Sequence, residues 1–294
     1  MRISQRLAAV VVAVFTAGVT TGVTVGVTVA APAMAARSDG PSVDLPSSIA
    51  ALGDSITRGF NACGFYRDCT RRSWSTGDDG DVGSHRLRLQ DAGVALADQS
   101  NLARTGAKSD ALPGQAQRAV AMQAQYVTIE IGANDACRRS PDDMTSLEDY
   151  RQHITEALAI LQTGLPHTRI FIASIPDLRR LWAVGHTSWY VRKAWNQLGV
   201  CQSMLKNPGS LAQEDVDRRD RVRTRTILYN EILAQACADY GPLCRFDDKA
   251  VFLTNFTRGQ ISKWDFFHPS TSGQRLLAQI TWEHSFFGVL AHSG

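Results

Sequence analysis

The chain has 294 residues and a formal net charge of +3 at pH 7, and 44% of its residues are hydrophobic. A charge so close to zero gives no electrostatic reason to expect nucleic acid as a partner. The same charge neither favours nor excludes weak contact with a lipid surface.

Residues 1–36 have the features of a secretory signal peptide. Two arginines form a short basic start, residues 7–31 are an apolar stretch, and Ala-Met-Ala at 33–35 is the small-x-small pattern of a signal-peptidase site. An uncleaved membrane anchor is the alternative, because the stretch is long enough to span a bilayer, but its many Thr and Gly residues would make a weak span. We expect cleavage after Ala35 or Ala36 and secretion of the protein to the extracellular space.

About 258 residues remain after that cleavage. Removing Arg2 and Arg6 from the 31 basic side chains leaves 29, against 28 acidic ones. This length suits one compact α/β domain with a sizeable core, and no second long apolar run or internal repeat occurs in it. We expect a linker at residues 37–48, which contain Ser, Pro and Asp, and a single domain over residues 49–294.

The spacing of apolar residues predicts strands and helices that alternate along this domain. Short apolar or β-branched runs predict strands at 49–52, 94–99, 126–131, 169–175 and 246–253. Helical spacing or composition predicts helices at 85–92, 113–123, 147–163, 211–240 and 272–286. This order implies a parallel sheet with helices on both faces. Sites in such sheets form at the carboxyl ends of the strands, so the segments after the first three strands and the last loop should converge.

Those segments carry residues suited to nucleophilic catalysis. They are Gly53-Asp54-Ser55-Ile56-Thr57, Asn101-Leu102-Ala103-Arg104-Thr105-Gly106, Gly132-Ala133-Asn134-Asp135 and Asp265-Phe266-Phe267-His268. A serine hydroxyl needs a base to become a good nucleophile; His268 is the candidate base, and Asp265 can fix its tautomer. The backbone N–H of Gly106 and the side chain of Asn134 can donate to developing negative charge.

These four segments, in this order, resemble the SGNH hydrolases, also called the GDSL esterase and lipase superfamily. The four letters correspond to Ser55, Gly106, Asn134 and His268. The resemblance implies a three-layer α/β/α flavodoxin-like fold with a sheet of about five strands, and ester hydrolysis through an acyl-serine intermediate. Ser55 would be the nucleophile, His268 the base and Asp265 the orienting acid. The oxyanion hole would consist of the backbone N–H groups of Ser55 and Gly106 and the side chain of Asn134.

A finer similarity is to the phospholipase B-type branch, in which Ser-Trp-Ser and Gly-Asp-Gly follow the nucleophile. Here Ser-Trp-Ser stands at 73–75, but Ile56 replaces the usual Leu and Asp78 stands where a Gly is common. We expect carboxylic esters, with lipid or lysophospholipid acyl esters favoured, hydrolysed by a monomer with no metal or cofactor. A carbohydrate O-acetyl esterase and a catalytically silent surface-binding module are the alternatives.

The six cysteines of the chain all follow the expected signal peptide. An even count in an exported protein favours disulfides, and zinc binding is disfavoured because no Cys-x-x-Cys or paired-histidine spacing is present. Six cysteines allow fifteen pairings, and the sequence does not choose among them. The pairing we favour, from the closest spacings onward, is Cys63–Cys69, Cys237–Cys244 and Cys137–Cys201.

Several further features have simpler interpretations than catalysis. The Trp-rich segment 181–200, which includes Trp182 to Trp195, is expected to be a packed insertion tethered by a cysteine; an apolar lid or acyl-chain wall is the alternative. The charged run at 215–225 is expected to be a solvated helix face. Asp54 is expected to cap the following helix or to hydrogen-bond across the turn, and Asp135 to support the neighbouring asparagine.

Overall fold

A computed structural model describes residues 44–292 of the chain. The expected signal peptide at 1–36 and most of the expected linker at 37–48 lie outside the described residues and stay predictions. Strand β1 begins at Ser48, the last residue of that linker.

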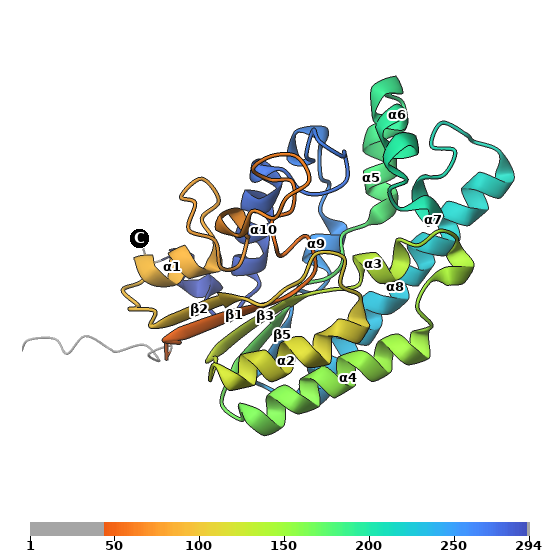
Figure 1. Ribbon diagram of the computed structural model, residues 1–294. Coiled ribbons are helices and arrows are strands. Elements are labelled where there is room, and N and C mark those ends of the chain that lie inside the picture. Colours follow the sequence, from red (N-terminus) through yellow and green to blue (C-terminus); the bar gives the residue numbers. More distant parts are fainter. Residues whose placement is uncertain (1–43, 293–294) are drawn as a thin grey trace, which may run out of the picture. The chain divides into compact units, whose positions relative to one another are not determined.

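A five-stranded parallel sheet forms the centre of the domain, which confirms the predicted fold class (Figure 1). Its strands stand in the order β2-β1-β3-β4-β5. Their bounds are Ser48–Gly53 for β1, Asp98–Asn101 for β2, Tyr126–Glu130 for β3, Arg169–Ile172 for β4 and Cys244–Phe246 for β5. Every residue of β1 and β3 is buried, because helices cover both faces of the sheet. The register places Gly53 beside Glu130 at the carboxyl ends of these two strands.

Helices flank the sheet in two layers. Figure 1 shows α2 (Leu112–Ala121), α4 (Leu147–Gly164) and α8 (Gln213–Tyr240) on one face, with α1 (His85–Asp91) and α10 (Thr271–Glu283) on the other. The shorter helices are α3 (Ala133–Ala136), α5 (Leu178–Gly185), α6 (Trp189–Leu198), α7 (Gln202–Leu205) and α9 (Ala250–Leu253). Five 3-10 turns are η1 (Thr70–Arg72), η2 (Ser109–Ala111), η3 (Pro141–Asp143), η4 (Arg258–Gln260) and η5 (Gly288–His292). Within residues 44–292, no helix is long and apolar enough to cross a bilayer.

Two predicted strands are misplaced. The strand predicted at 94–99 begins later, at Asp98, because β2 is a polar edge strand and the apolar residues before it lie in the preceding loop. The prediction of one strand over 246–253 is wrong: β5 ends at Phe246 and α9 follows. The Asp247 carboxylate accepts the backbone N–H groups of Lys249 and Val251, and these bonds favour a helical turn over an extended chain.

The interpretation of 215–225 as a solvated face is wrong for the side of α8 that packs beneath α5, whereas Asp217, Arg221 and Thr224 on the other side are exposed. Asp215, Arg219 and Val222 are buried at helical spacing. The Arg219 guanidinium lies 4.3 Å from the centroid of the Trp182 ring and donates to the Ser210 carbonyl. The Arg219 charge is therefore accommodated by the Trp182 ring and the Ser210 carbonyl.

The segment 181–200 forms most of α5 and all of α6. Trp182 and Trp195 are buried, and their indole N–H groups donate to backbone carbonyls of other segments. The structure contains three disulfides, Cys63–Cys69, Cys137–Cys201 and Cys237–Cys244. The second of these ties the end of this segment to the residue after α3.

Candidate active site

The turn that carries Ser55 is held by its neighbours on the sheet. Gly53 has φ +141°, and a Cβ atom there would lie 2.1 Å from the Glu130 carbonyl oxygen, so only glycine fits. Gln115 of α2 accepts from the Gly53 N–H and donates to its carbonyl oxygen, at 2.6 and 2.9 Å. One Asp54 carboxylate oxygen accepts the N–H of Ile56 at 2.8 Å. These bonds fix the end of β1 and thereby the position of the serine that follows.

Ser55, His268 and Asp265 form a continuous hydrogen-bonded chain. Ser55 Oγ lies 2.8 Å from His268 Nε2, and His268 Nδ1 lies 2.6 Å from Asp265 Oδ2. With the Nδ1 proton donated to the carboxylate, Nε2 can accept the serine proton. The other oxygen of Asp265 accepts the backbone N–H groups of Phe267 and His268. The backbone of its own loop therefore holds Asp265, the acid expected from the sequence, in contact with the imidazole of His268.

The Asp265 carboxylate is stabilised in its charged form. Burial acts to raise its pKa, but the hydrogen bond and charge of His268, the Phe267 N–H and Asn61 together hold the pKa of Asp265 below its ordinary value. A negative charge next to the far ring nitrogen can stabilise an imidazolium as it forms.

Asn61 is a contributor that the sequence analysis missed. Its side-chain N–H donates to Asp265 Oδ2 at 2.7 Å, and its own amide oxygen accepts from the Tyr66 N–H. The Asn61 N–H in turn donates to the Arg67 carbonyl, across a loop closed by a disulfide. The two partners lie 204 residues apart in sequence, and no local pattern announces their contact.

Three N–H donors line the groove next to the serine. Within the described residues, the backbone N–H groups of Ser55 and Gly106 donate to no protein acceptor, and Gly106 has φ +78°, which glycine adopts without strain. The Asn134 side chain donates to the Ala107 carbonyl at 2.9 Å and to Asp54 Oδ2 at 3.3 Å. Ser55, Gly106 and Asn134 line the same groove, which is about 260 Å³ in volume and also lined by His268.

A pair of buried carboxyls lies behind the serine. Burial raises the pKa of Asp54 to about 7, and burial together with the charge of Asp54 raises the pKa of Glu130 well above its ordinary value. Neither Glu130 oxygen has a donor within the described part of the chain. A proton on Glu130 turns its contact with Asp54 into a hydrogen bond, so we assign at least one proton to the pair near neutral pH. From the sequence alone, Glu130 is expected only to belong to a strand.

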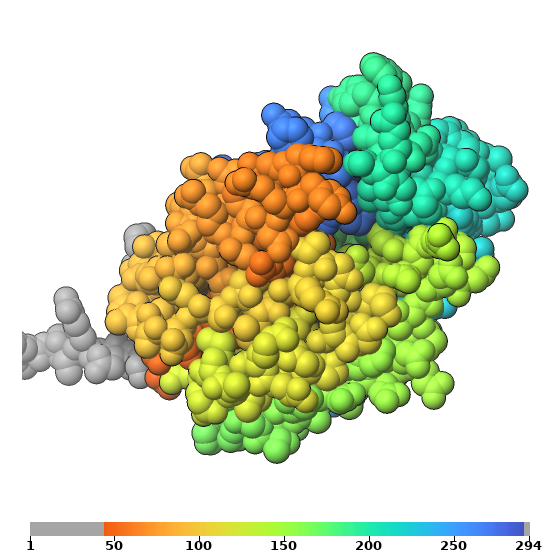
Figure 2. Space-filling model, viewed as in Figure 1, coloured from red at the N-terminus to blue at the C-terminus, as the bar shows by residue number. Residues whose placement is uncertain are grey.

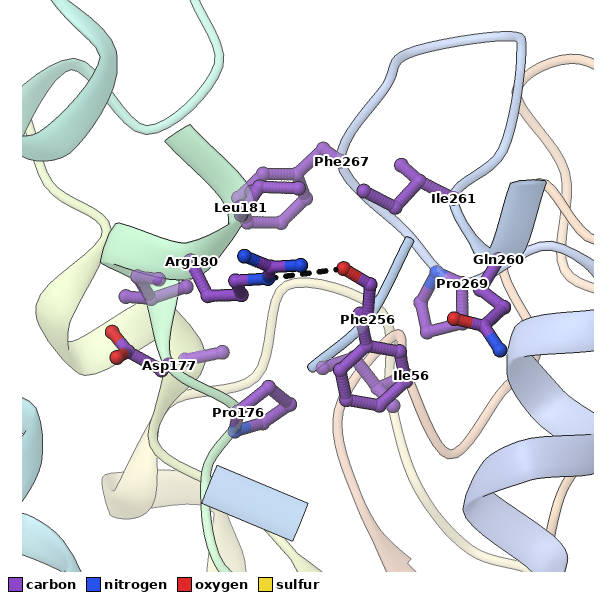
Figure 3. A pocket seen from close by; sticks show the side chains of 12 residues that line it. Ile56, Pro176, Asp177, Arg180, Leu181, Phe256, Gln260, Ile261, Phe267 and Pro269 are labelled. Carbon is purple, nitrogen blue, oxygen red and sulfur yellow. Dashed lines mark hydrogen bonds between the residues drawn. The ribbon is translucent and has the colours of Figure 1, made fainter. Parts of the chain in front are cut away.

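A second, apolar hollow adjoins the groove (Figure 3). Phe267 lines both spaces. The hollow is walled by neighbours of the chemistry-bearing residues: Ile56 follows the serine, Ala133 precedes the asparagine, and Pro269 follows the histidine. Figure 3 shows Leu181 and Phe267 at one end of the hollow and Ile56 with Phe256 at the other. Pro176, Leu178 and Ile261 complete the apolar lining. Asp177, Arg180 and Gln260 are its polar members, and Arg180 Nε donates to the Phe256 carbonyl at 3.2 Å.

The other buried polar groups that could be mistaken for catalytic ones have structural partners. His85 is buried between the hydroxyls of Tyr126 and Thr281, and burial lowers its pKa to about 3. Asp135 accepts from the backbone and side chain of Ser109 and lies beside Asn134, and Ser109 also contacts His153. Among residues 44–292, no group of three or more His, Cys, Asp or Glu is placed to hold a metal ion.

Known proteins resemble the chain in sequence and in fold. Residues 49–281 match the family model for GDSL-like lipases and acylhydrolases. Human membrane-associated phospholipase B1 is 29% identical over 164 residues, which span 46% of this chain but only 11% of the human protein. The crystal structure of TesA has a TM-score of 0.50 at 14% identity and covers 81% of this chain and 97% of its own. A structure described as a GDSL-like lipase, from Parabacteroides merdae, has a TM-score of 0.50 at 20% identity, covering 85% and 100%. The two structures show the shared fold.

Proposed function

The chain belongs to the GDSL-like lipase and acylhydrolase family and is a carboxylic ester hydrolase, and we propose that Ser55 is the nucleophile through which it acts. The observation that carries this proposal is the continuous chain from Ser55 Oγ through His268 to Asp265, with links of 2.8 and 2.6 Å. A serine in hydrogen-bond contact with an oriented imidazole can attack an ester carbonyl at neutral pH.

The reaction then proceeds in two halves. Ser55 Oγ bonds to the carbonyl carbon while its proton passes to His268 Nε2, and Asp265 stays ionised beside the imidazolium. The tetrahedral intermediate collapses as Nε2 returns the proton to the leaving oxygen, which departs as the alcohol and leaves an acyl-Ser55 ester. Water attacks this ester with its proton taken by Nε2, and the acid is released as Ser55 regains a proton.

The oxyanion of each tetrahedral intermediate would be bound by three donors. The N–H groups of Ser55 and Gly106 have no other acceptor in the described chain, which leaves them available to the substrate oxygen. Of the two hydrogen bonds that the Asn134 side chain donates, the one to Asp54 is the longer, at 3.3 Å. The N–H group of this bond is the one that would also donate to the oxyanion. The 2.9 Å bond to Ala107 would keep the amide in place.

For the substrate, we propose acyl esters of lipids, including lysophospholipids. The apolar hollow beyond Phe267 supports this, because an ester carbonyl at Ser55 could direct its acyl chain past that ring. About 50 Å³ of the hollow is open to atoms the size of water, against 10–15 Å³ needed for one water. It therefore has room for the first few carbons of a chain. The partial likeness to a phospholipase B adds support.

We further propose that the domain at 49–294 acts as a secreted monomer once residues 1–36 are removed. Three disulfides support export, since such bonds persist in oxidising compartments. The mass of the N-terminal peptide of the secreted protein would test the cleavage after Ala35 or Ala36.

The nucleophile is tested by labelling and substitution together. A fluorophosphonate should add to Ser55, as seen by peptide mass, and Ser55→Ala should lose p-nitrophenyl ester hydrolysis with an unchanged circular dichroism spectrum. Ser272→Ala, which removes an exposed hydroxyl at the start of α10, is the matched control and should keep full activity. Turnover by Ser55→Ala, or an adduct on another residue, would overturn the assignment.

The substrate class is tested by a panel on the wild-type enzyme. Esters of p-nitrophenol with acyl chains of increasing length, lysophosphatidylcholine and acetylated xylan should be compared by kcat/KM. The lipid proposal expects lysophosphatidylcholine to exceed the acetylated polysaccharide. The reverse order would favour a carbohydrate O-acetyl esterase.

A further inference from the structure

Three segments distant in sequence surround the mouth of the groove. They are residues 58–68, which follow the serine turn, residues 186–200, which contain α6, and residues 255–268, which precede and include the histidine. We call them the rim segments. Each contributes to the lining of the groove that holds Ser55. Figure 2 shows 58–68 in orange, 186–200 in green and 255–268 in blue at the same side of the domain, with a hollow between the orange and green parts.

The rim segments expose large aromatic side chains. The side chains of Tyr66, Trp189 and Phe65 are 75%, 69% and 54% exposed. Those of Trp264 and Tyr190 are exposed as well. The Phe65 ring lies 5.8 Å from Tyr66 and 6.1 Å from Trp264, centroid to centroid. Single exposed aromatics need no explanation, but Phe65, Tyr66 and Trp264 form a group at the groove, and such a group marks an interaction site.

Cations accompany these rings. The Lys263 ammonium lies 5.1 Å from the centroid of Trp264, and the Arg258 guanidinium lies 5.7 Å from that of Tyr190. The exposed basic residues of the rim segments include Arg67, Lys193, Arg258 and Lys263.

Acidic groups do not balance this charge. The rim segments contain two acids: Asp68 pairs with Arg58 at 2.8 Å, and Asp265 is buried against His268. The rim is therefore positive although the chain as a whole is close to neutral.

We propose that the rim segments seat the enzyme on the surface of anionic phospholipid aggregates. Tryptophan and tyrosine favour the boundary between water and lipid, where the ring is apolar and the polar tip stays wet. Lysine and arginine beside them are attracted to anionic head groups. A lipid surface also fits the position of the rim, because an ester lifted from it would enter the groove directly. A protein seated there would instead cover the groove.

This inference rests on the proposed lipid substrate, and its test separates the two. The probe is sedimentation with vesicles of phosphatidylcholine and phosphatidylglycerol at 7:3, compared with pure phosphatidylcholine, using the secreted Ser55→Ala protein without residues 1–36, so that no lipid is hydrolysed and the apolar N-terminal stretch is absent. We expect binding to the anionic vesicles and at least tenfold weaker binding to the neutral ones. Adding Lys263→Glu or Trp264→Ser should each weaken anionic binding roughly tenfold.

Matched controls carry comparable changes, a base to Glu and an exposed apolar residue to Ser, outside the rim. Arg151→Glu on α4 and Val289→Ser in η5 alter exposed residues and should leave vesicle binding unchanged. In the active enzyme, Lys263→Glu should hydrolyse dissolved p-nitrophenyl acetate at the wild-type rate. Hydrolysis of that ester without binding to anionic vesicles would overturn the docking inference alone. Equal loss in the rim and control variants would overturn it too, whereas failure on every ester would overturn the proposed function.

Discussion

The buried carboxyls of Asp54 and Glu130 should make the enzyme less stable as the pH rises from 5 to 7, and Glu130→Gln should remove the part of that loss that Glu130 contributes. In the unfolded chain these groups ionise near their ordinary values of 3.8 and 4.5. In the folded protein, burial raises the pKa of Asp54 to about 7 and that of Glu130 well above its ordinary value. The folded pair therefore keeps a proton that the unfolded chain has released.

The sign and size of the effect follow from that proton. Stability falls with rising pH wherever the folded state binds more protons than the unfolded one. One retained proton costs about 1.4 kcal/mol per pH unit, so two units cost about 2–3 kcal/mol, allowing for partial protonation of the unfolded carboxyls at pH 5. A glutamine at position 130 has nearly the same shape and can still donate to Asp54, but it has no proton to release.

The assay is urea unfolding of wild type and Glu130→Gln at pH 5, 6 and 7. The free energy of unfolding of the wild type should fall relative to that of the variant by about 2–3 kcal/mol across this range. Glu148→Gln, at an exposed position on α4, is the control and should keep the wild-type slope. Parallel slopes for wild type and Glu130→Gln would refute the prediction, because they would mean that Glu130 is ionised in the folded protein.

Three further predictions concern the site and its supports. Asn134→Ala should lower kcat for a short p-nitrophenyl ester by about 10²–10³, and a near-normal kcat would remove this side chain from the oxyanion hole. Asn61→Ala deletes the 2.7 Å hydrogen bond to Asp265. A hydrogen bond to a charged group is worth about 1.5–3 kcal/mol, so kcat/KM should fall about ten- to hundredfold. An unchanged kcat/KM would show that His268 and the backbone of the loop are enough to hold Asp265 in place. The double substitution Cys137→Ser with Cys201→Ser removes a disulfide between residues 64 positions apart. The free energy of unfolding, measured in urea, should therefore fall by about 4 kcal/mol. A fall of less than about 1 kcal/mol would mean that closing this loop does not stabilise the protein.

The main strands and the positions of the site residues were predictable because their signals are local. The run before Gly53 is apolar without interruption, and Tyr126–Glu130 is rich in β-branched residues, as strands buried on both faces require. Parallel strands end at one edge of the sheet, so the polar residues after β1 and β3 had to lie together. His268 and Asp265 share one loop and needed no long-range information to be paired.

What the sequence analysis missed depends on contacts between segments far apart in the chain. Nothing around Asn61 indicates that Asp265 would accept from it across 204 residues. The burial of Arg219 depends on α5, whose Trp182 ring covers the guanidinium, and a charge pattern read along one helix contains no such partner. Glu130 is a similar case, because only the register of β1 against β3 brings its carboxyl next to Asp54.

The Trp-rich segment combines the two interpretations that its sequence left open. Trp195 is buried and donates to the Phe266 carbonyl, two residues before the histidine, and the Cys137–Cys201 disulfide ties the end of the segment to the residue after α3. These two attachments make the segment a packed wall of the groove. Its exposed residues, Trp189 and Tyr190, then face outward from a fixed support. Fixed rings of this kind suit the proposed docking, because a surface whose side chains are already in place loses little conformational entropy on contact with lipid.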